Sequence, residues 1–315
     1  IIRRFGVQVP VGPLMSSHSY ISNSKNEDIF ININGELFHR NEAKISVFDS
    51  GFLLGDGVWE GIRLHKSTLV FIEEHLDRLF ASAQGISLDI PLSRQNILDE
   101  LNKVLIKNNM NDNIHIRLIV SRGDKITPYQ NPNANVGPIN FVIIPEYKKT
   151  NPETYIKGLT IGRVDNVRPN ENILSPHYNT LSKLNCILAS IEANKHGYDE
   201  GIMNDINGNV STCNSTNLFF IQDNTVITST GEYCLNGITR GKAIQLCHEN
   251  NIQCNEINFR FDDIRNCDEA FVTGTFAGII PVAKLEKKEL KSTNPTSIVN
   301  KLRKLYNKKI EEYVG

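Results

Sequence analysis

The segment Phe48-Asp-Ser-Gly-Phe-Leu-Leu-Gly-Asp-Gly-Val-Trp-Glu-Gly-Ile-Arg63 gathers four glycines and several acidic residues among apolar side chains. Glycine permits positive φ angles and a close approach of the backbone to its neighbours. So dense a group of glycines predicts a turn at the wall of a pocket. Turn glycines also occur where they serve only the turn, so the interpretation depends on the sequence around the segment.

A candidate phosphate ligand follows this segment. The sequence Glu74-His-Leu-Asp-Arg-Leu79 lies within a stretch of helical periodicity from Ile72 to Ala83. His75 and Arg78 are three residues apart and therefore share one face of the expected helix. An arginine at this place is either a solvated helix charge or a ligand that holds phosphate with two parallel hydrogen bonds.

Two later segments have features of anion-binding turns. Asn236-Gly-Ile-Thr-Arg240 precedes a helix that is expected to open near Gly241, and helix N-termini offer free N–H groups to a phosphate. Thr239 is placed either to cap that helix or to give its hydroxyl to a phosphate oxygen. Thr273-Gly-Thr-Phe-Ala-Gly278 follows an expected strand and is a second candidate turn. Each segment is ambiguous by itself.

Taken in order, these segments resemble the class IV aminotransferases, which are the fold type IV pyridoxal-phosphate enzymes. The resemblance runs from about Ile31 to Val282 and includes Ser182-Lys-Leu-Asn185, His196-Gly-Tyr-Asp-Glu-Gly201 and Ser215-Thr-Asn-Leu-Phe219. The family contains branched-chain aminotransferases, D-amino acid aminotransferases and aminodeoxychorismate lyases. The resemblance implies an α/β (α+β) fold of two domains, similar to D-amino acid aminotransferase, and pyridoxal 5′-phosphate as the cofactor.

The resemblance also implies roles for single residues. It makes Lys183 the lysine that binds the cofactor covalently and then moves the α-proton of the substrate. Burial and nearby cations lower the pKa of such a lysine, which leaves a neutral amine able to attack an aldehyde. The further residues that it assigns are Arg78, Ile238, Thr239 and Thr275 at the cofactor phosphate, and Trp59, Phe276 and Ala277 at the substrate.

One position departs from the family pattern. Where the family has a glutamate that pairs with the pyridine nitrogen of the cofactor, this chain has Thr212, in the run Gly208-Asn-Val-Ser-Thr-Cys-Asn-Ser-Thr-Asn217. A carboxylate keeps that nitrogen protonated and strengthens the ring as an electron sink, whereas a neutral hydroxyl does not do so by charge. Asp205 is the nearest acid upstream and a possible substitute. We therefore expect Thr212 to contact the cofactor and transamination to be slow.

These features favour the transfer of an amino group between an amino acid and a 2-oxo acid. His115 and Arg117 are two apart on an expected strand, so both face one side, and Arg117 resembles a residue that holds substrate in branched-chain enzymes. The loop from Arg122 to Gly137 lacks an Arg-x-His motif associated with D-amino acid aminotransferases, which favours a branched-chain-like L-amino acid. The alternatives are a D-amino acid aminotransferase, a lyase of the aminodeoxychorismate lyase type, and a cofactor-binding protein with vestigial activity.

The composition excludes other classes of protein. A formal net charge of −1 gives no long-range attraction to nucleic acid or to an anionic membrane, and no stretch approaches the ~20 apolar residues of a membrane span. The six cysteines are scattered without a C-x-x-C pair or a histidine at zinc-ligand spacing, so we expect no metal site. We interpret them as reduced thiols of a cytoplasmic protein. The family resemblance further implies a homodimer.

The length of 315 residues suggests two domains. We expect an N-terminal extension over residues 1–28, a small α/β domain over 29–146 and an interdomain linker over 147–156. A larger cofactor-binding α/β domain follows over 157–315 and ends in an amphipathic helix. Within the small domain, Asn34-Gly35 predicts a hairpin turn, and Leu92 to Lys107 predicts a second helix.

Overall fold

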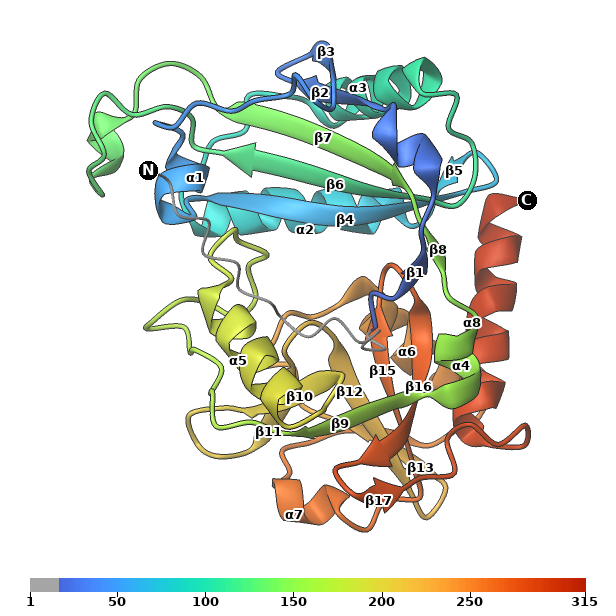
Figure 1. Ribbon diagram of the computed structural model, residues 1–315. Helices are drawn as coiled ribbons and strands as arrows, with labels where there is room; N and C mark the ends of the chain where they lie inside the picture. The colour runs from blue at the N-terminus through green and yellow to red at the C-terminus, as the bar shows by residue number, and fades with distance from the viewer. Residues whose placement is uncertain (1–16) are drawn as a thin grey trace, which may run out of the picture.

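The computed structural model describes residues 17–315, which fold into two lobes, each built on its own β-sheet (Figure 1). The N-terminal part of the chain forms the upper lobe in this view. The remainder forms the lower lobe, with the C-terminal helix α8 (Ile298–Val314) at its side. The two-lobed α/β architecture that the sequence predicts is confirmed.

The upper lobe contains a six-stranded sheet with the strand order β3-β2-β7-β6-β4-β5. Its strands are β2 (Phe30–Ile33), β3 (Glu36–His39), β4 (Gly57–His65), β5 (Thr68–Leu69), β6 (Ile114–Ser121) and β7 (Asn140–Tyr147). Helices α2 (Ile72–Gly85) and α3 (Arg94–Lys107) contribute Leu76, Leu79, Ile97 and Leu101 to one hydrophobic core with the strands. The expected hairpin at Asn34-Gly35 and both expected helices are therefore present.

Along β6 from Ile114 to Leu118, buried apolar side chains alternate with polar ones, so the two faces of the upper sheet differ. Ile114, Ile116 and Leu118 are buried in the core beneath α2 and α3. Successive side chains of a strand point to opposite faces, so His115 and Arg117 project from the other face. That face looks toward the lower lobe, and the shared side expected for His115 and Arg117 is borne out.

The lower lobe contains a nine-stranded sheet with the order β11-β10-β9-β16-β15-β12-β13-β14, and β17 pairs with β16 at the side. Its strands are β9 (Leu159–Arg163), β10 (Glu200–Asn204), β11 (Val210–Cys213), β12 (Asn217–Gln222), β13 (Thr225–Thr228), β14 (Cys254–Glu256), β15 (Glu269–Gly274), β16 (Gly278–Leu285) and β17 (Lys288–Glu289). The helices are α4 (Glu153–Lys157), α5 (Leu184–Lys195), α6 (Ile238–Glu249), α7 (Phe261–Ile264) and α8. The central strands are buried, as Phe219 and Phe271 illustrate by stacking 4.6 Å apart.

The glycine-rich segment proves to be more than a turn. It forms the short helix α1 (Ser50–Leu54), a turn at Gly55 with φ of 70°, and then the strand β4. Within β4 glycine serves close packing, because a Cβ at Gly57 would lie 2.5 Å from the Val120 carbonyl oxygen. The turn was predictable from the sequence but the strand was missed, because glycine is usually depleted from strand interiors.

Part of the expected N-terminal extension over residues 1–28 is described, and it contacts the rest of the fold. Strand β1 (Tyr20–Ile21) pairs with β8 (Lys149–Thr150) in the connection between the lobes, and the 3-10 turn η1 (Ser24–Glu27) follows it. Ser17 donates a hydrogen bond to the buried Glu200. Residues 1–16 of the expected extension lie outside the described residues.

Candidate active site

Two adjoining cavities open between the lobes. The larger one, called the main cavity here, has a volume of about 370 Å³ and is lined by Lys183, Arg168 and Thr212, among others. The smaller one, called the anion cavity, has a volume of about 110 Å³ and is lined by Arg78, Ile238, Thr239 and Thr275, among others. Seven residues line both: His18, Trp59, Arg117, Asn179, Ser215, Asn217 and Leu235. A main cavity of this size holds a small organic ligand.

Lys183 stands at the N-cap of α5, where the expected helix begins. Its Nζ lies 5.7 Å from the centroid of the Trp59 ring, inside the main cavity. Burial, together with the cationic groups of Arg168, Arg78 and Arg117, lowers the pKa of Lys183 to about 8. A substantial fraction of this amine is therefore neutral and nucleophilic near pH 8.

Trp59 and Arg117 make one unit on neighbouring strands. The guanidinium carbon of Arg117 lies 3.7 Å from the centroid of the Trp59 ring, in a stacked cation–π contact. The indole Nε1 donates to the carbonyl oxygen of Thr180 at 3.1 Å, which fixes the ring against the lower lobe. Stacking leaves the edge of the guanidinium, with its N–H groups, available to an anion in either cavity.

Arg78 is held in place by Glu60, a buried carboxylate that was not singled out from the sequence. Its Nε and Nη2 donate to the two carboxylate oxygens of Glu60, each at 2.8 Å. His75 Nδ1 lies 2.7 Å from the same carboxylate, so the expected shared face of His75 and Arg78 is turned toward β4. Burial alone would raise the pKa of Glu60, but Arg78 and His75 hold it below its ordinary value. The remaining Arg78 Nη1 contacts the carbonyl of Asn236 at 3.4 Å.

The far wall of the anion cavity is made by two turns. Helix α6 begins at Ile238 with Gly237 as its N-cap, so Thr239 is not the cap that the sequence allowed. The first N–H groups of the helix, including those of Ile238 and Thr239, have no acceptor within the helix and point out of its N-terminus. Thr275 stands opposite, in the turn between β15 and β16. This combination of N–H groups, hydroxyl and Arg78 suits a phosphate.

Phe276 and Ala277, both expected at the substrate, are separated by the fold. Phe276 lines the anion cavity and packs edge-on against His115 at 5.6 Å. Ala277 is absent from the lining of the main and anion cavities, and its carbonyl oxygen accepts a hydrogen bond from Tyr155 at 2.7 Å. Ala277 stands in the turn before β16, and the substrate contact expected for it stays a prediction.

Thr212 lines the main cavity from β11. Its hydroxyl donates to the carbonyl oxygen of Thr216 at 2.6 Å, so only the lone pairs of the oxygen remain for a ligand. Asp205 is not among the residues that line either cavity, and its carboxylate accepts from the backbone N–H groups of Asn207 and Asn209, each at 2.8 Å. The residues that line the two cavities, all in the described part of the chain, include neither aspartate nor glutamate.

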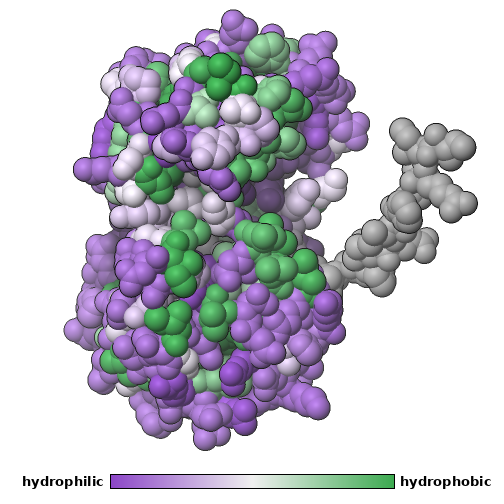
Figure 2. Space-filling model, turned by 90° about the vertical axis from the view of Figure 1, so that its left-hand side faces the viewer, coloured by the Kyte–Doolittle hydropathy of each residue, from purple (hydrophilic) through white to green (hydrophobic). Residues whose placement is uncertain are grey.

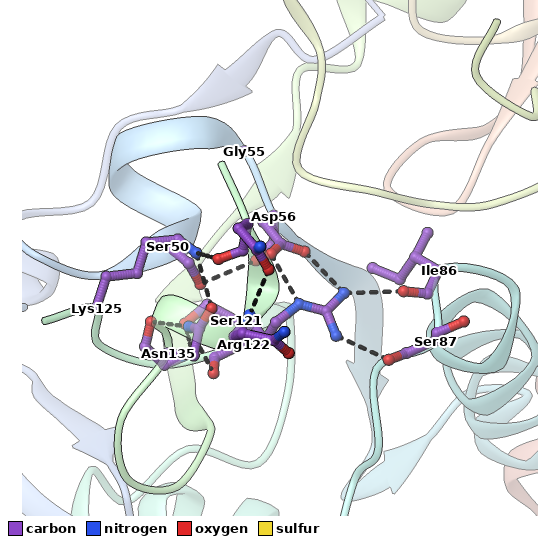
Figure 3. A network of polar contacts seen from close by, with 12 residues as sticks. Ser50, Gly55, Asp56, Ile86, Ser87, Ser121, Arg122, Lys125 and Asn135 are labelled. Atoms are coloured by element: carbon purple, nitrogen blue, oxygen red, sulfur yellow. Dashed lines mark hydrogen bonds and ion pairs between the residues drawn. The ribbon is translucent and has the colours of Figure 1, made fainter. Parts of the chain in front are cut away.

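The long loop from Arg122 to Gly137 is fastened beside the site by the network in Figure 3. Arg122 pairs with Asp56 and donates to the carbonyl oxygens of Ile86 and Ser87, at 2.8 and 2.7 Å. Within the loop, which includes the 3-10 turn η2 (Pro132–Ala134), Lys125 Nζ donates to Asn135 Oδ1 at 2.7 Å. The base of the loop is therefore fixed to the same Gly55–Asp56 turn that adjoins Lys183 through Ser182.

Arg168 and Asn179 are two of the cavity residues that were missed at the level of the sequence. Arg168 is 9% exposed, its Nη1 lies 2.9 Å from the sulfur of Cys186, and its Nε has no hydrogen-bond partner. Asn179 is 1% exposed and lines both cavities. Neither belongs to a periodic or repeated pattern, so the only available signal was their position in the irregular segment that leads to Lys183.

The described residues contain no group of three or more His, Cys, Asp or Glu side chains arranged to hold a metal ion. All six cysteines are free thiols, and Cys213, Cys234, Cys247 and Cys267 are buried. No helix between residues 17 and 315 is long and apolar enough to cross a membrane.

Fold and site together define a two-lobed α/β protein whose cavities between the lobes are lined by Lys183 and three arginines. The model of the family Amino-transferase class IV matches residues 57–285, most of the chain, and the protein belongs to that family. This finding confirms the resemblance on which the residue assignments were based.

Relatives and solved structures agree with this membership. The chain is 34% identical to a branched-chain-amino-acid aminotransferase-like protein 1 of Arabidopsis thaliana over 89% of its length, but it spans only about half (50%) of that relative. It is 34% identical to a putative branched-chain-amino-acid aminotransferase of Methanocaldococcus jannaschii, covering 88% of this chain and 94% of the relative. A D-alanine aminotransferase of Listeria monocytogenes is 29% identical, covering 90% and 96%.

The fold itself matches branched-chain aminotransferases of known structure. The branched-chain amino acid aminotransferase of Escherichia coli superposes with a TM-score of 0.83 at 25% identity, covering 90% of this chain and 95% of that one. The branched-chain amino acid aminotransferase of Thermobaculum terrenum, solved in its PLP-form, superposes with a TM-score of 0.78 at 23% identity, covering 90% and 94%. Coverage of this extent includes both lobes.

Proposed function

We propose that the protein is a pyridoxal-phosphate-dependent aminotransferase that moves an amino group between a branched-chain-like L-amino acid and a 2-oxo acid. The observation that carries the proposal is the pairing of the two cavities. The anion cavity has the donors of a phosphate site, and the adjoining main cavity presents the buried amine of Lys183 with a pKa of about 8. The names of the M. jannaschii and E. coli relatives support the substrate class.

The residues present fit the cofactor at its phosphate end. Arg78, the N-terminus of α6 and Thr275 would hold the phosphate, and Glu60 keeps the Arg78 guanidinium oriented without a bound ligand. Thr212 would face the opposite end, as the family resemblance implies. When bound, the cofactor supplies the electron sink for removing the α-proton of an amino acid.

The residues of the chain would then divide the work as follows. Lys183 Nζ, in its neutral form, would hold the cofactor and would take and return the α-proton of the substrate. Arg117, flat on Trp59, receives the substrate carboxylate with its free edge. Trp59 and Phe276 exclude water from the reacting atoms by their apolar surfaces.

A lyase of the aminodeoxychorismate lyase type is the second candidate, and Thr212 is the observation that favours it. A weak electron sink suits elimination better than complete transamination. A D-amino acid aminotransferase is a further alternative, supported by the Listeria relative. The test is a panel of L- and D-amino donors against pyruvate and 2-oxoglutarate, with both the 2-oxo product and free ammonia measured. Oxo product without ammonia supports the transaminase, whereas equal amounts of oxo product and ammonia from a donor with a leaving group on its β-carbon support a lyase.

We further propose a homodimer of cytoplasmic location. Apolar side chains gather on the face that carries α1 and α5, on both sides of the cleft (Figure 2). The exposed members are Phe52 and Leu54 of α1 and Leu184, Ile187, Leu188 and Ile191 of α5. We call this set the α1/α5 face. Exposed apolar patches of this kind mark interaction surfaces, and a second copy would cover it beside the cavity mouth. The free thiols support a reducing compartment.

A further inference from the structure

Asn179 is held rigidly with one polar atom left over. Its backbone N–H donates to Ser82 Oγ at 3.0 Å, and its backbone carbonyl accepts from the Trp59 N–H at 3.0 Å. Its side-chain Nδ2 donates to the Trp59 carbonyl oxygen at 2.8 Å. Because a carbonyl only accepts, this bond fixes the amide nitrogen on that side and turns Oδ1 away from it. Oδ1 is buried and has no hydrogen-bond partner in the structure.

The surroundings of Oδ1 point to a ligand. Asn179 lies where the main and anion cavities meet, and it lines both of them. The charged side chains of the two cavity walls are those of Arg78, Arg117, Arg168 and Lys183, and no carboxylate lines either cavity within the described residues. A buried acceptor without a partner costs free energy unless a donor reaches it. The cavities therefore have many groups for anions, and Asn179 Oδ1 adds a fixed acceptor without a partner for an N–H donor.

We propose that Asn179 Oδ1 accepts a hydrogen bond from the amino group of the amino-acid substrate and so distinguishes the amino acid from its 2-oxo acid. The proposal rests on the aminotransferase function above. The amino group is the only cationic part of such a substrate, and the surrounding arginines repel it. A 2-oxo acid has its keto oxygen at the same place. Because that oxygen and Oδ1 are both acceptors, they repel each other and form no hydrogen bond. Asn179 is thus a specificity residue that favours the aminated ligand.

The single tryptophan of the chain, Trp59, lies in both cavities and reports ligand binding by its fluorescence. Protein loaded with pyridoxal phosphate would be titrated with L-leucine, with its 2-oxo acid, and with 4-methylpentanoate, which lacks the amino group. The variants are Asn179→Leu and Asn179→Asp. Both lose the bond to the Trp59 carbonyl, but only Asn179→Asp keeps an acceptor oxygen toward the cavity, so their difference isolates the role of Oδ1.

In Asn179→Leu we expect the affinity for L-leucine to fall about 10- to 100-fold, while that for 4-methylpentanoate changes by less than about 3-fold. Asn179→Asp should retain the preference for L-leucine over 4-methylpentanoate. If Asn179→Leu does not fold, the loss of this preference in Asn179→Asp would by itself overturn the inference. An equal loss for all three ligands overturns the inference, as does a changed reactivity of Lys183 with unchanged leucine affinity. Loaded protein without any preference for leucine overturns only this inference. Failure to bind pyridoxal phosphate overturns the proposed function as well.

Discussion

The guanidinium of Arg117 lies 3.7 Å from the centre of the Trp59 ring, so one cation of the site is oriented by an aromatic plane and not by a carboxylate. Burial lowers the pKa of Arg117, opposed by Glu146 and Glu60, but arginine remains charged at neutral pH. An arginine held in this way keeps its full charge for a ligand.

Replacing Arg117 by alanine should raise the KM for the amino acid about 10-fold or more and leave cofactor affinity nearly unchanged. Arg117→Lys keeps the charge but loses the planar group over the Trp59 ring. Its KM should therefore lie between those of the unmutated protein and of Arg117→Ala. Steady-state kinetics with L-leucine and with an amine that lacks the carboxylate are the measurement. Equal turnover of both donors by the unmutated protein would show that Arg117 does not bind a carboxylate.

Covalent labelling at Lys183 should depend on pH. Because its pKa is lowered to about 8, the neutral amine grows from about one tenth of the population at pH 7 to about nine tenths at pH 9. Borohydride trapping of added pyridoxal phosphate should therefore rise across this interval and place the label on the peptide with Lys183. Lys148 is a useful comparison, since it is also a partly buried lysine but lies against the Phe276 ring. A label on Lys148, or none, refutes the assignment.

The Arg78–Glu60 pair should control cofactor affinity. Arg78→Ala removes a charge-assisted contact to phosphate, at about 1.5–3 kcal/mol per bond, and should weaken pyridoxal phosphate about 10–150-fold. It also leaves Glu60 buried with His75 alone, so the free energy of unfolding should fall by about 3–5 kcal/mol.

Urea denaturation separates the two effects of Arg78→Ala. Arg94, an exposed arginine paired with Asp77 on the outside of the same lobe, is the matched control and should change neither quantity. Because the pKa of Glu60 is depressed in the folded protein, its stabilising contribution is present above pH 4.5 and declines as the pH falls below that value. If the stability of Arg78→Ala no longer declines below pH 4.5, the decline in the unmutated protein comes from the Arg78–Glu60 pair.

Thr212 should leave the pyridine nitrogen of the bound cofactor largely unprotonated, since neither cavity has a carboxylate in its described lining. Nitrogen-15 NMR of labelled cofactor measures this directly. Thr212→Glu should raise the proton affinity of the nitrogen and increase transamination, whereas Thr212→Val, which keeps the shape, should not. A protonated nitrogen in the unmutated protein would contradict this account of Thr212.

The α1/α5 face should hold two copies together. Leu188→Glu combined with Ile191→Glu places two charges in the proposed interface, and neither residue lines the main cavity. Analytical ultracentrifugation should show a dimer for the unmutated protein and a monomer for this variant. Ile106→Glu, at an apolar residue that is 76% exposed on α3, should remain dimeric. A monomeric unmutated protein would remove the α1/α5 face from consideration as an interface between copies.

The elements with regular periodicity were predictable from the sequence, and those defined by packing between distant segments were not. The faces of α2 and β6 followed from spacings of three and two residues, which brought His75 together with Arg78 and His115 with Arg117. Strand β4 was missed because its glycines look like turn residues until the neighbouring backbone is in place.

The orphan oxygen of Asn179 and the bidentate bond of Glu60 depend on partners far away in the sequence. No local pattern contains such information. Thr212 shows the intermediate case. Its departure from the family was visible in the sequence. The hydrogen-bond partners of Asp205 and of the Thr212 hydroxyl could be identified only in the structure.

Where the chain crosses between the lobes, backbone hydrogen bonds join the two lobes directly. The segment from Asn179 to Leu181, which leads into the lower lobe, runs along β4 of the upper lobe: Leu181 N–H donates to Gly57 and Trp59 N–H donates to Asn179, at 2.9 and 3.0 Å. These are ladder bonds of the kind that join strands within one sheet. The upper sheet is thus extended at β4 by residues 179–181, and this pairing lies in the wall of the site. This part of the cavity wall is therefore complete only when residues 57–59 and 179–181, far apart in the chain, lie side by side.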